Sequence, residues 1–339
     1  MMPPTTMEAW TYTSASGGLE KNLTFQTSTR APAPKPGFVL VQVISASINP
    51  VDYKLPELPF GIGQLIISTP SSPGLDFCGR VVTATGDFNE GQKVFGRLDP
   101  TQFGSLGQYV LAPLAGCVAL PEGVSCDEGA AIGTAAVTAY QCLLKGAEDG
   151  ELKGKSVFIH GGSGGVGVWG IQIAKTLGAK VTTTCSSKNA DMLMSLGADE
   201  VIDYTEGHLV EKLEAKGQVF DLIVDNVGLP VELYFAAHRF TKTGAQYVQV
   251  GGGMSFASTR AMMSKRLTPR FLGGGERPFT FLMCHNDPKD FAQIAKWVQE
   301  KRIKVVFDQI FEYEDVPKAY EKLKTGRAKG KIVVHVTKG

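Results

Sequence analysis

The sequence predicts an α/β protein in which a doubly wound parallel sheet is joined to a second, β-rich domain. The segment Lys155–Lys188 runs from a strand through a glycine-rich turn and a helix into another strand. Part of this pattern repeats, because Leu177–Val181 (LGAKV) is echoed by Leu196–Val201 (LGADEV), as successive strand–helix–strand units require. Before Pro121, short strand-like runs alternate with turns rich in Gly and Pro, which is typical of a small barrel.

The glycine-rich turn indicates a dinucleotide site. Ser156–His160 is apolar and β-branched, as in a buried strand. The pattern Gly-x-Gly-x-x-Gly follows it directly and opens a helix, which is the context that this fingerprint requires. Glycines permit a sharp turn and a close approach to a pyrophosphate, and the helix N-terminus offers N–H groups and a positive dipole end. The predicted contacts are Gly162, Ser163, Gly164, Gly165, Val166 and Gly167.

The end of the next strand favours NADPH over NADH. An NAD site usually places a carboxylate there to hold the ribose 2′-hydroxyl, whereas this chain has Ser186, Ser187 and Lys188. Two hydroxyls and a cation can bind a 2′-phosphate that a carboxylate would repel. Alternatively, Ser187 only caps the following helix and Lys188 is solvated.

Composition excludes several classes of partner. The 339 residues suffice for two domains, and the net charge of +1 gives no sign of a nucleic-acid or membrane partner. The 6 cysteines contain no C-x-x-C pair, which favours reduced thiols. The start of the chain lacks the features of a signal peptide, and no stretch is long enough to span a bilayer. We therefore expect a cytoplasmic protein, with organelle association left open.

The domain order follows from where the pattern changes. Cys126–Leu144 is Ala-rich and helical by propensity, and it leads into the nucleotide domain. Strand-like segments near the end of the chain, Val305–Ile310 and Lys331–Val336, lie beyond that domain and are expected to return to the β-rich part. This predicts a nucleotide domain over residues 128–299 and a discontinuous β-rich domain over residues 1–127 and 300–339.

Several motifs together resemble one family. They are Ile48–Lys54 (INPVDYK), Pro73–Gly79 (PGLDFCG), Gly162–Gly167, Leu196–Tyr204 (LGADEVIDY), Asp221–Gly228 (DLIVDNVG) and Gly330–Val333 (GKIV). Over essentially its whole length the chain resembles the medium-chain dehydrogenase/reductase superfamily, in its zinc-free quinone oxidoreductase branch. The likeness is to the chloroplast-envelope quinone oxidoreductase homologue and, more distantly, to fungal trans-acting enoyl reductases. It implies a Rossmann domain and a GroES-like barrel.

The departures from the zinc enzymes of this superfamily predict that no metal is bound. Those enzymes have Cys where this chain has Asn49, and His where it has Leu75. A catalytic zinc needs three protein ligands, so two are missing. The cysteine-rich structural-zinc lobe is also missing between Asp87 and Tyr109.

The resemblance implies hydride transfer from NADPH to the β-carbon of an α,β-unsaturated carbonyl, followed by protonation of the α-carbon. The developing oxyanion needs hydrogen-bond donors rather than a strong acid. By resemblance, the catalytic candidates are Asn49 as an amide donor, Lys54 as a positive charge or ribose contact, and Tyr53 as a proton relay that water can replace. The alternative is that Asn49 only forms a turn and Tyr53 only packs.

Further cofactor contacts carry over by motif alone. They are Thr138, Tyr204, Asn226, Gly228, Val250, Gly251 and Lys331. Asn226, Gly228, Val250 and Gly251 follow strands at the edge where nucleotides lie in such sheets. Tyr204 either flanks the 2′-phosphate or is an ordinary aromatic at a strand end.

Four functions compete. The first is an NADPH-dependent reductase of an enone or enal double bond, and the second is an NADPH quinone oxidoreductase on the same scaffold. The third is an enoyl reductase acting in trans with a polyketide synthase partner. The fourth is a non-catalytic NADPH-binding structural protein. The loops Leu55–Pro73 and Gly251–Phe279 are expected to shape the pocket, and relatives suggest either a homodimer or a monomer.

Overall fold

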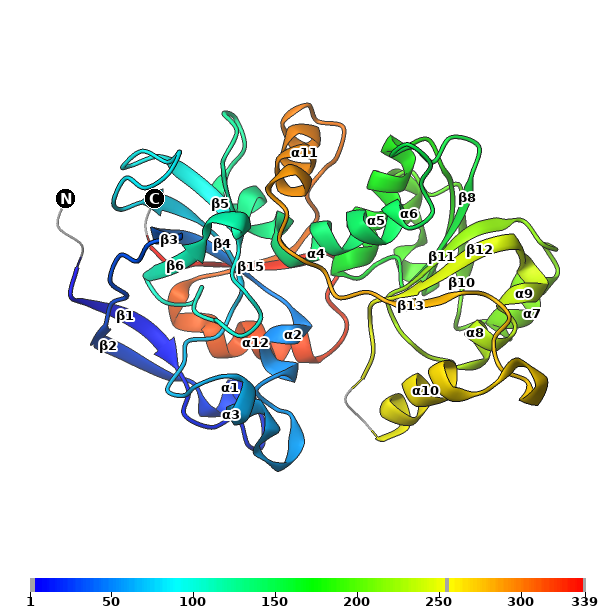
Figure 1. Ribbon diagram of the computed structural model, residues 1–339, viewed down its shortest axis with the longest axis horizontal. Coiled ribbons are helices and arrows are strands. Elements are labelled where there is room, and N and C mark those ends of the chain that lie inside the picture. Colours follow the sequence, from blue (N-terminus) through cyan, green and yellow to red (C-terminus); the bar gives the residue numbers. More distant parts are fainter. Residues whose placement is uncertain (1–3, 254–255, 338–339) are drawn as a thin grey trace. The chain divides into compact units, whose positions relative to one another are not determined.

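The computed structural model describes residues 4–253 and 256–337, which form two compact units (Figure 1). Unit 1 contains the chain up to Val137, His285–Lys301 and the chain from Val305 onward. Unit 2 contains Thr138–Cys284 and Arg302–Lys304. The boundaries between the β-rich domain and the nucleotide domain, expected at 127/128 and 299/300, stay predictions.

Unit 2 is built on a parallel sheet of six strands in the order β10-β9-β8-β11-β12-β13. The strands are β8 (Ser156–His160), β9 (Lys180–Cys185), β10 (Glu200–Asp203), β11 (Phe220–Asp225), β12 (Thr241–Gln249) and β13 (Phe279–Phe281). The order reverses between β8 and β11, where nucleotides bind in doubly wound sheets. The predicted Rossmann sheet is confirmed.

In the described part of unit 2, six helices accompany this sheet. They are α5 (Gly165–Thr176), α6 (Ala190–Ser195), α7 (Leu209–Glu214), α8 (Glu232–Phe235), α9 (Ala237–Phe240) and α10 (Phe256–Leu267). Of these, α5, α6 and α9 pack directly on its strands. The sequence showed no clear pattern around α10. The physical reason is that its buried positions include a lysine, Lys265, four residues after Ala261, so that no apolar stripe marks the helix.

Unit 1 is the β-rich part. Its main sheet has seven strands, in the order β14-β15-β3-β4-β5-β7 with β6 paired to β3, and β1 and β2 form a separate ribbon. The strands are β1 (Thr6–Thr11), β2 (Thr24–Arg30), β3 (Phe38–Ile48), β4 (Asp76–Val81), β5 (Lys93–Arg97), β6 (Tyr109–Pro113), β7 (Cys117–Ala119), β14 (Phe307–Phe311) and β15 (Lys331–His335). Because β15 pairs with β3, placing Ile332 opposite Ile48, the discontinuous β-rich domain is confirmed.

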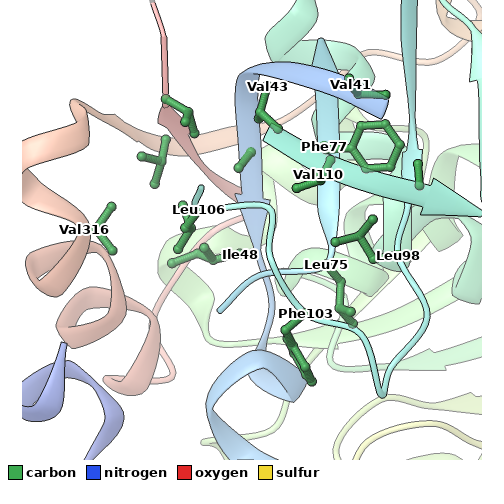
Figure 2. Close-up of a cluster of buried hydrophobic side chains, with 14 of the residues drawn as sticks. Val41, Val43, Ile48, Leu75, Phe77, Leu98, Phe103, Leu106, Val110 and Val316 are labelled. Atoms are coloured by element: carbon green, nitrogen blue, oxygen red, sulfur yellow. The ribbon is translucent and has the colours of Figure 1, made fainter. Parts of the chain in front are cut away.

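Figure 2 shows the core of unit 1, where side chains of the sheet and of α12 meet. Leu75 is fully buried there beside Phe77, so the position that holds His in zinc relatives is part of an apolar core. The helices of this unit are α1 (Leu19–Asn22), α2 (Pro50–Lys54), α3 (Ile62–Ile66), α11 (Pro288–Gln299) and α12 (Val316–Lys324). Helix α4 (Cys126–Leu144) begins in unit 1 and has the predicted bounds. Within the described ranges, no helix is long and apolar enough to cross a membrane.

Candidate functional site

The glycine turn after β8 has the shape of a nucleotide cradle. A Cβ on Gly162 would lie 2.1 Å from Thr183 Oγ1, and one on Gly167 would lie 2.3 Å from the Gly161 carbonyl oxygen. These two glycines are therefore required by packing within the turn. A Cβ on Gly164 would meet, of the residues described, only the Gly161 carbonyl oxygen, at 3.8 Å. The turn thus leaves open space at Gly164, where a ligand can approach the backbone.

Helix α5 begins at the open side of this turn. Its N-cap is Gly164, whose lack of a side chain leaves the N–H groups of the first turn without a side-chain cap, and that turn has no acidic residue. The helix runs for 12 residues, and all residues from Gly167 to Ala174 are buried, so that packing fixes the position of its N-terminus. Such an end attracts an anion through its N–H groups and its dipole. The cradle fits a pyrophosphate.

His160, at the end of β8, has both ring nitrogens hydrogen-bonded to other groups of the protein. Its Nδ1 lies 2.8 Å from Thr184 Oγ1 and its Nε2 lies 3.1 Å from the Leu229 carbonyl oxygen. The carbonyl can only accept, so Nε2 carries the proton, and Thr184 donates to Nδ1 while its oxygen accepts from Gly161 N–H at 2.9 Å. Burial lowers the pKa of His160, which agrees with a neutral imidazole. Its role is to join the glycine turn to the β9 strand end.

The predicted 2′-phosphate contacts gather after β9 and β10. Ser186 is half-buried, Ser187 and Lys188 are exposed, and Tyr204 is 53% exposed. The structure brings a carboxylate to this place that the sequence reasoning missed: Asp203 Oδ2 accepts from Ser187 N–H at 2.6 Å.

The Asp203 carboxylate bonds both the segment after β9 and the segment after β10. Its Oδ1 accepts from the Thr205 hydroxyl at 2.6 Å, and these hydrogen bonds hold the pKa of Asp203 below its usual range. The parallel pairing of Asp203 with Cys185 could have revealed this neighbour, had the strand register been known. A phosphate here would face Lys188 and also a negative charge that is partly neutralised by hydrogen bonds.

The loops after β11 and β12 meet through glycines. A Cβ on Gly251 would lie 1.9 Å from the Asn226 carbonyl oxygen, and one on Gly228 would lie 2.6 Å from Gln249 Nε2. Val250 N–H donates to the Asp225 carbonyl at 2.9 Å, which joins the two strand ends. Four predicted cofactor residues therefore lie together.

Asn226 carries a buried amide between these loops. Its side-chain oxygen and nitrogen are both buried and have no hydrogen-bond partner in residues 4–253 and 256–337. Buried polar atoms are rarely left unpaired, because each costs about 1–3 kcal/mol. An amide with one acceptor and two donors left over fits a polar ligand at this sheet edge, as expected for a nicotinamide nucleotide.

Thr138, the remaining predicted contact in this unit, lies in α4. It is 3% exposed, and the next residue, Ala139, packs against α5, where a Cβ on Gly170 would lie 3.9 Å from the Ala139 Cβ. Its contact with the nicotinamide stays a prediction.

In unit 1, Asn49 is the centre of a buried polar cluster. It is 5% exposed and is the N-cap of α2. Its Nδ2 donates to Asp76 Oδ2 at 2.7 Å, and its Oδ1 accepts from Lys331 Nζ at 2.5 Å. Its backbone N–H donates to Asp52 Oδ2 at 2.7 Å. The amide is thereby locked in one orientation, and Nδ2 retains a second N–H.

We call these residues, with Thr134, the Asp76 cluster (Asn49, Asp52, Asp76, Thr134 and Lys331). Its three charged side chains, Asp52, Asp76 and Lys331, are all buried. Lys331 Nζ lies 3.7 Å from Asp76 Oδ2, and both side chains are almost completely buried. Burial, reinforced by the nearby Asp76 carboxylate, raises the pKa of Asp52 well above its usual range. Burial also lowers the pKa of Lys331, against the opposing effect of the two carboxylates.

Helix α4 completes the cluster. Asp76 Oδ1 accepts from Thr134 N–H at 2.7 Å and from the Thr134 hydroxyl at 2.6 Å. The helix is kinked at Gly133, where a Cβ would lie 2.2 Å from Asp76 Cγ, so glycine is needed to admit the aspartate. Arg97 Nε donates to Thr134 Oγ1 at 3.2 Å. Asp76 belongs to the Pro73–Gly79 motif, but the motif does not reveal its partners, and no sequence pattern marks Thr134 or Arg97.

Tyr53 and Lys54 follow Asn49 on α2. The Tyr53 ring packs against the unit 1 core, with Lys324 Nζ 5.3 Å from the ring centroid. Burial raises the pKa of Tyr53 and lowers that of Lys54. Three of the predicted reaction-site residues therefore lie on one short element, and Lys331 is joined to it through Asn49.

At the position of the catalytic metal in zinc relatives, Asn49 and Leu75 replace two of the three protein ligands that a catalytic zinc needs. Elsewhere in the described part of the chain, His285, Asp287 and Asp290 have ligand atoms within 4.8 Å of one another. Asp287 Oδ1 accepts from Lys289 N–H at 2.9 Å and so caps α11. The zinc-independent chemistry stays a prediction.

Comparison with known families agrees with this fold. The alcohol dehydrogenase GroES-like domain matches residues 35–122, and the zinc-binding dehydrogenase family matches residues 196–334. The solved structure of the quinone oxidoreductase from Coxiella burnetii superposes with a TM-score of 0.84 at 28% identity, covering 98% of this chain and 100% of that one.

Three relatives match over nearly the whole chain. The trans-enoyl reductase pgmF of Aspergillus terreus is 46% identical and covers 98% of this chain and 97% of its own length. The 2-methylene-furan-3-one reductase of Solanum lycopersicum is 32% identical, with coverages of 98% and 80%. The chloroplastic quinone-oxidoreductase homolog of Spinacia oleracea is 30% identical, with coverages of 97% and 98%.

The order of similarity corrects the one expected from the motifs, since the fungal trans-enoyl reductase is more similar than the chloroplastic homologue. The family itself is confirmed, and with it a nicotinamide cofactor that fits the cradle at Gly164. The chain belongs to the quinone oxidoreductase branch of the medium-chain dehydrogenase/reductase superfamily and is an oxidoreductase.

Proposed function

We propose that this protein is an NADPH-dependent, zinc-independent reductase of the carbon–carbon double bond of an α,β-unsaturated carbonyl. Bound NADPH would supply a hydride, and the acceptor would be the β-carbon of the substrate. The observation that carries the proposal is the buried Asp76 cluster, which fixes an amide donor at the position where zinc relatives have a metal ligand. Two relatives named above support the substrate class, because one is named for an enoyl group and the other for a methylene conjugated with a ketone.

In unit 2, three groups of residues would bind successive parts of the dinucleotide. The cradle is formed by Gly162, Ser163, Gly164, Gly165, Val166 and Gly167. Its backbone N–H groups would hold the pyrophosphate, except that of Gly162, which already donates to the Thr184 carbonyl at 2.9 Å. Ser186, Ser187 and Lys188, with Tyr204 beside them, would hold the 2′-phosphate and so select NADPH. Thr138, Asn226, Gly228, Val250 and Gly251 would hold the nicotinamide end.

In unit 1, the chain would stabilise the negative charge that develops on the carbonyl oxygen. Asn49 would donate its second Nδ2 hydrogen, and Asp76 and Lys331 would keep that hydrogen in place. Since Lys331 is 2% exposed and bonded to Asn49 Oδ1, it would influence the cofactor through Asn49. Lys54 would add positive charge, and Tyr53 or water would deliver the proton to the α-carbon.

A second candidate is an enoyl reductase that works in trans on a substrate bound to a polyketide synthase. The observation that favours it is the 46% identity with a trans-enoyl reductase. The substrate chemistry would be unchanged, and only its delivery would differ. A third candidate, quinone reduction, is supported by the similarity to the Coxiella burnetii enzyme.

Nicotinamide oxidation with a panel of acceptors tests these proposals. The panel contains free enones and enals, an enoyl thioester that mimics a carrier-bound chain, quinones, and saturated ketones as controls. We expect turnover of conjugated alkenes with NADPH, much less with NADH, and none of saturated ketones. Turnover of the thioester alone would favour the trans-acting enzyme, and turnover of quinones alone would contradict double-bond reduction. Tight NADPH binding without turnover of any acceptor would point to a structural role.

A further inference from the structure

Helix α10 buries a lysine against the loops of the nucleotide unit. The side chains of Lys265 and Asp225 are both fully buried, with Nζ 3.6 Å from Asp225 Oδ2. Lys265 Nζ also donates to the Gly228 carbonyl at 3.0 Å and to Gln249 Oε1 at 2.8 Å. The ring of Tyr247 lies beneath it, with Nζ 5.6 Å from the ring centroid. The Lys265 ammonium group therefore makes two hydrogen bonds and an ion pair with the Asp225 carboxylate.

These acceptors belong to two different strand ends. Asp225 and Gly228 stand at the end of β11 and in the loop after it, and Gln249 is the last residue of β12. Gln249 also donates its Nε2 to the Gly251 carbonyl at 2.7 Å. One lysine therefore ties both loops together and ties them to α10.

Asp225 fixes the same loops from the other side. Its Oδ1 accepts from Val227 N–H at 3.0 Å and from Gly228 N–H at 2.8 Å, and its Oδ2 accepts from Tyr247 Oη at 2.7 Å. Asn226 lies between Asp225 and Val227, and its buried amide has no hydrogen-bond partner among the residues that the structure describes. The backbone on both sides of Asn226 is thus held by buried charges, while its side chain is left for a ligand.

Packing alone does not explain a lysine at this position. A buried ion pair adds little net stability compared with apolar side chains of similar volume, so methionine or leucine would fill the space as well. A charge is retained usefully where its hydrogen bonds fix one geometry. Here those bonds reach the Gly228 backbone directly and the Gly251 backbone through the Gln249 side chain.

We propose that Lys265 is a positioning residue for the nicotinamide nucleotide: it holds the loops after β11 and β12 in the arrangement that presents the Asn226 amide to the ligand. This inference rests on the proposed function, since it assumes that the nucleotide binds at this edge. Lys265 touches no cofactor phosphate in this account, so its loss weakens NADPH and NADH binding equally.

The test compares Lys265→Met with Arg266→Met, its exposed neighbour on α10, by titration with NADPH and NADH and by thermal unfolding. We expect Lys265→Met to raise the Kd of both nucleotides by about tenfold or more, and Arg266→Met to leave them unchanged. Lys265→Met also leaves Asp225 buried without its cation and lowers the unfolding temperature. The double variant Asp225→Asn/Lys265→Met removes both charges, and we expect it to recover much of that temperature without recovering the affinity.

The outcomes separate the role from simple stabilisation. A folded Lys265→Met or double variant that binds both nucleotides as tightly as the parent overturns the positioning role. Affinity that recovers in parallel with the unfolding temperature in the double variant also overturns it, because stability would then explain the defect. A parent chain that binds neither nucleotide overturns the proposed function, and the cofactor role of Lys265 with it, so the two failures are distinguishable.

Discussion

Each unit of this protein buries a lysine beside an aspartate, but the two pairs bond different groups. In unit 1, Lys331 and Asp76 both bond the side chain of Asn49, which is thereby paired at both ends. In unit 2, Lys265 and Asp225 bond backbone groups on both sides of Asn226, whose amide has no partner within the described part of the chain.

The difference suggests a division of work. A paired amide keeps a fixed direction and has one hydrogen left to donate, which suits the stabilisation of charge at a reacting centre. An unpaired amide on a fixed backbone can donate and accept at once, which suits the recognition of a ligand with both kinds of group. The buried charges contribute geometry in both units, and the predictions below break each arrangement in turn.

The largest expected effect is on stability, from Asp76→Asn. The substitution keeps the shape of the side chain but removes the charge that faces Lys331. It also replaces one of the two oxygens that accept from Thr134 and Asn49 by an amide nitrogen, which cannot accept. Breaking a buried pair costs about 3–5 kcal/mol of the free energy of unfolding. Urea unfolding at neutral pH measures it, with Asp87→Asn in an exposed turn as the control, for which we expect a change within about 0.5 kcal/mol. A variant as stable as that control would show that the cluster holds no buried ion pair.

The next effect is on turnover, from Asn49→Ala. Loss of one oxyanion donor typically lowers kcat by about 100-fold or more, and NADPH binding should persist, because the cradle lies in the other unit. Steady-state kinetics and NADPH titration measure the two quantities, with Asn89→Ala in an exposed loop as the control. Unchanged turnover would reduce Asn49 to a helix cap.

A smaller effect separates the two nucleotides. Lys188→Glu replaces attraction to a 2′-phosphate by repulsion, so we expect the KM for NADPH to rise by about tenfold or more while that for NADH changes little. The exposed Lys145→Glu serves as the matched charge reversal. Equal changes for both nucleotides would contradict the assignment of Lys188, and would direct attention to Asp203 as the residue that governs specificity.

The smallest effect depends on pH. Because the pKa of Asp52 is raised in the folded protein, its contribution to stability is fully present below its unfolded pKa of about 3.9 and is lost as the pH rises through the folded value. Asp52→Asn does not titrate. We therefore expect the free energy of unfolding of the parent to fall relative to the variant by about 1 kcal/mol or more between pH 4 and pH 7. A gap that is constant over this range, in urea unfolding at both pH values, would show that Asp52 ionises normally.

The sequence predicted those parts of the molecule that depend on local pattern. The strands β8 and β9, the glycine turn and the bounds of α4 are as expected, because apolar runs, glycines and alanines carry their signal within a few residues. Helix α11 depends on the same kind of signal, because its buried residues Phe291, Ile294, Ala295 and Val298 recur at helical spacing.

What the sequence could not show depends on contacts between distant segments. Asp203 reaches Ser187 only through the pairing of two strands, and Thr134 reaches Asp76 only through the kink in α4. Lys265 lies on a helix whose buried face is partly charged, so neither periodicity nor a motif marked it. The expectation of loops over Leu55–Pro73 and Gly251–Phe279 was wrong in part, since these stretches contain α3 and α10.

The central claim is that the hydride of NADPH reaches the β-carbon of a conjugated carbonyl. It is tested most directly with NADPH carrying deuterium at C4 of the nicotinamide, a conjugated enone as acceptor, and analysis of the product by NMR. When the deuterium is on the face of C4 that donates the hydride, we predict one deuterium at the β-carbon of the product and a proton from solvent at the α-carbon. Deuterium on the carbonyl carbon, giving an alcohol, or a product without deuterium would contradict the account.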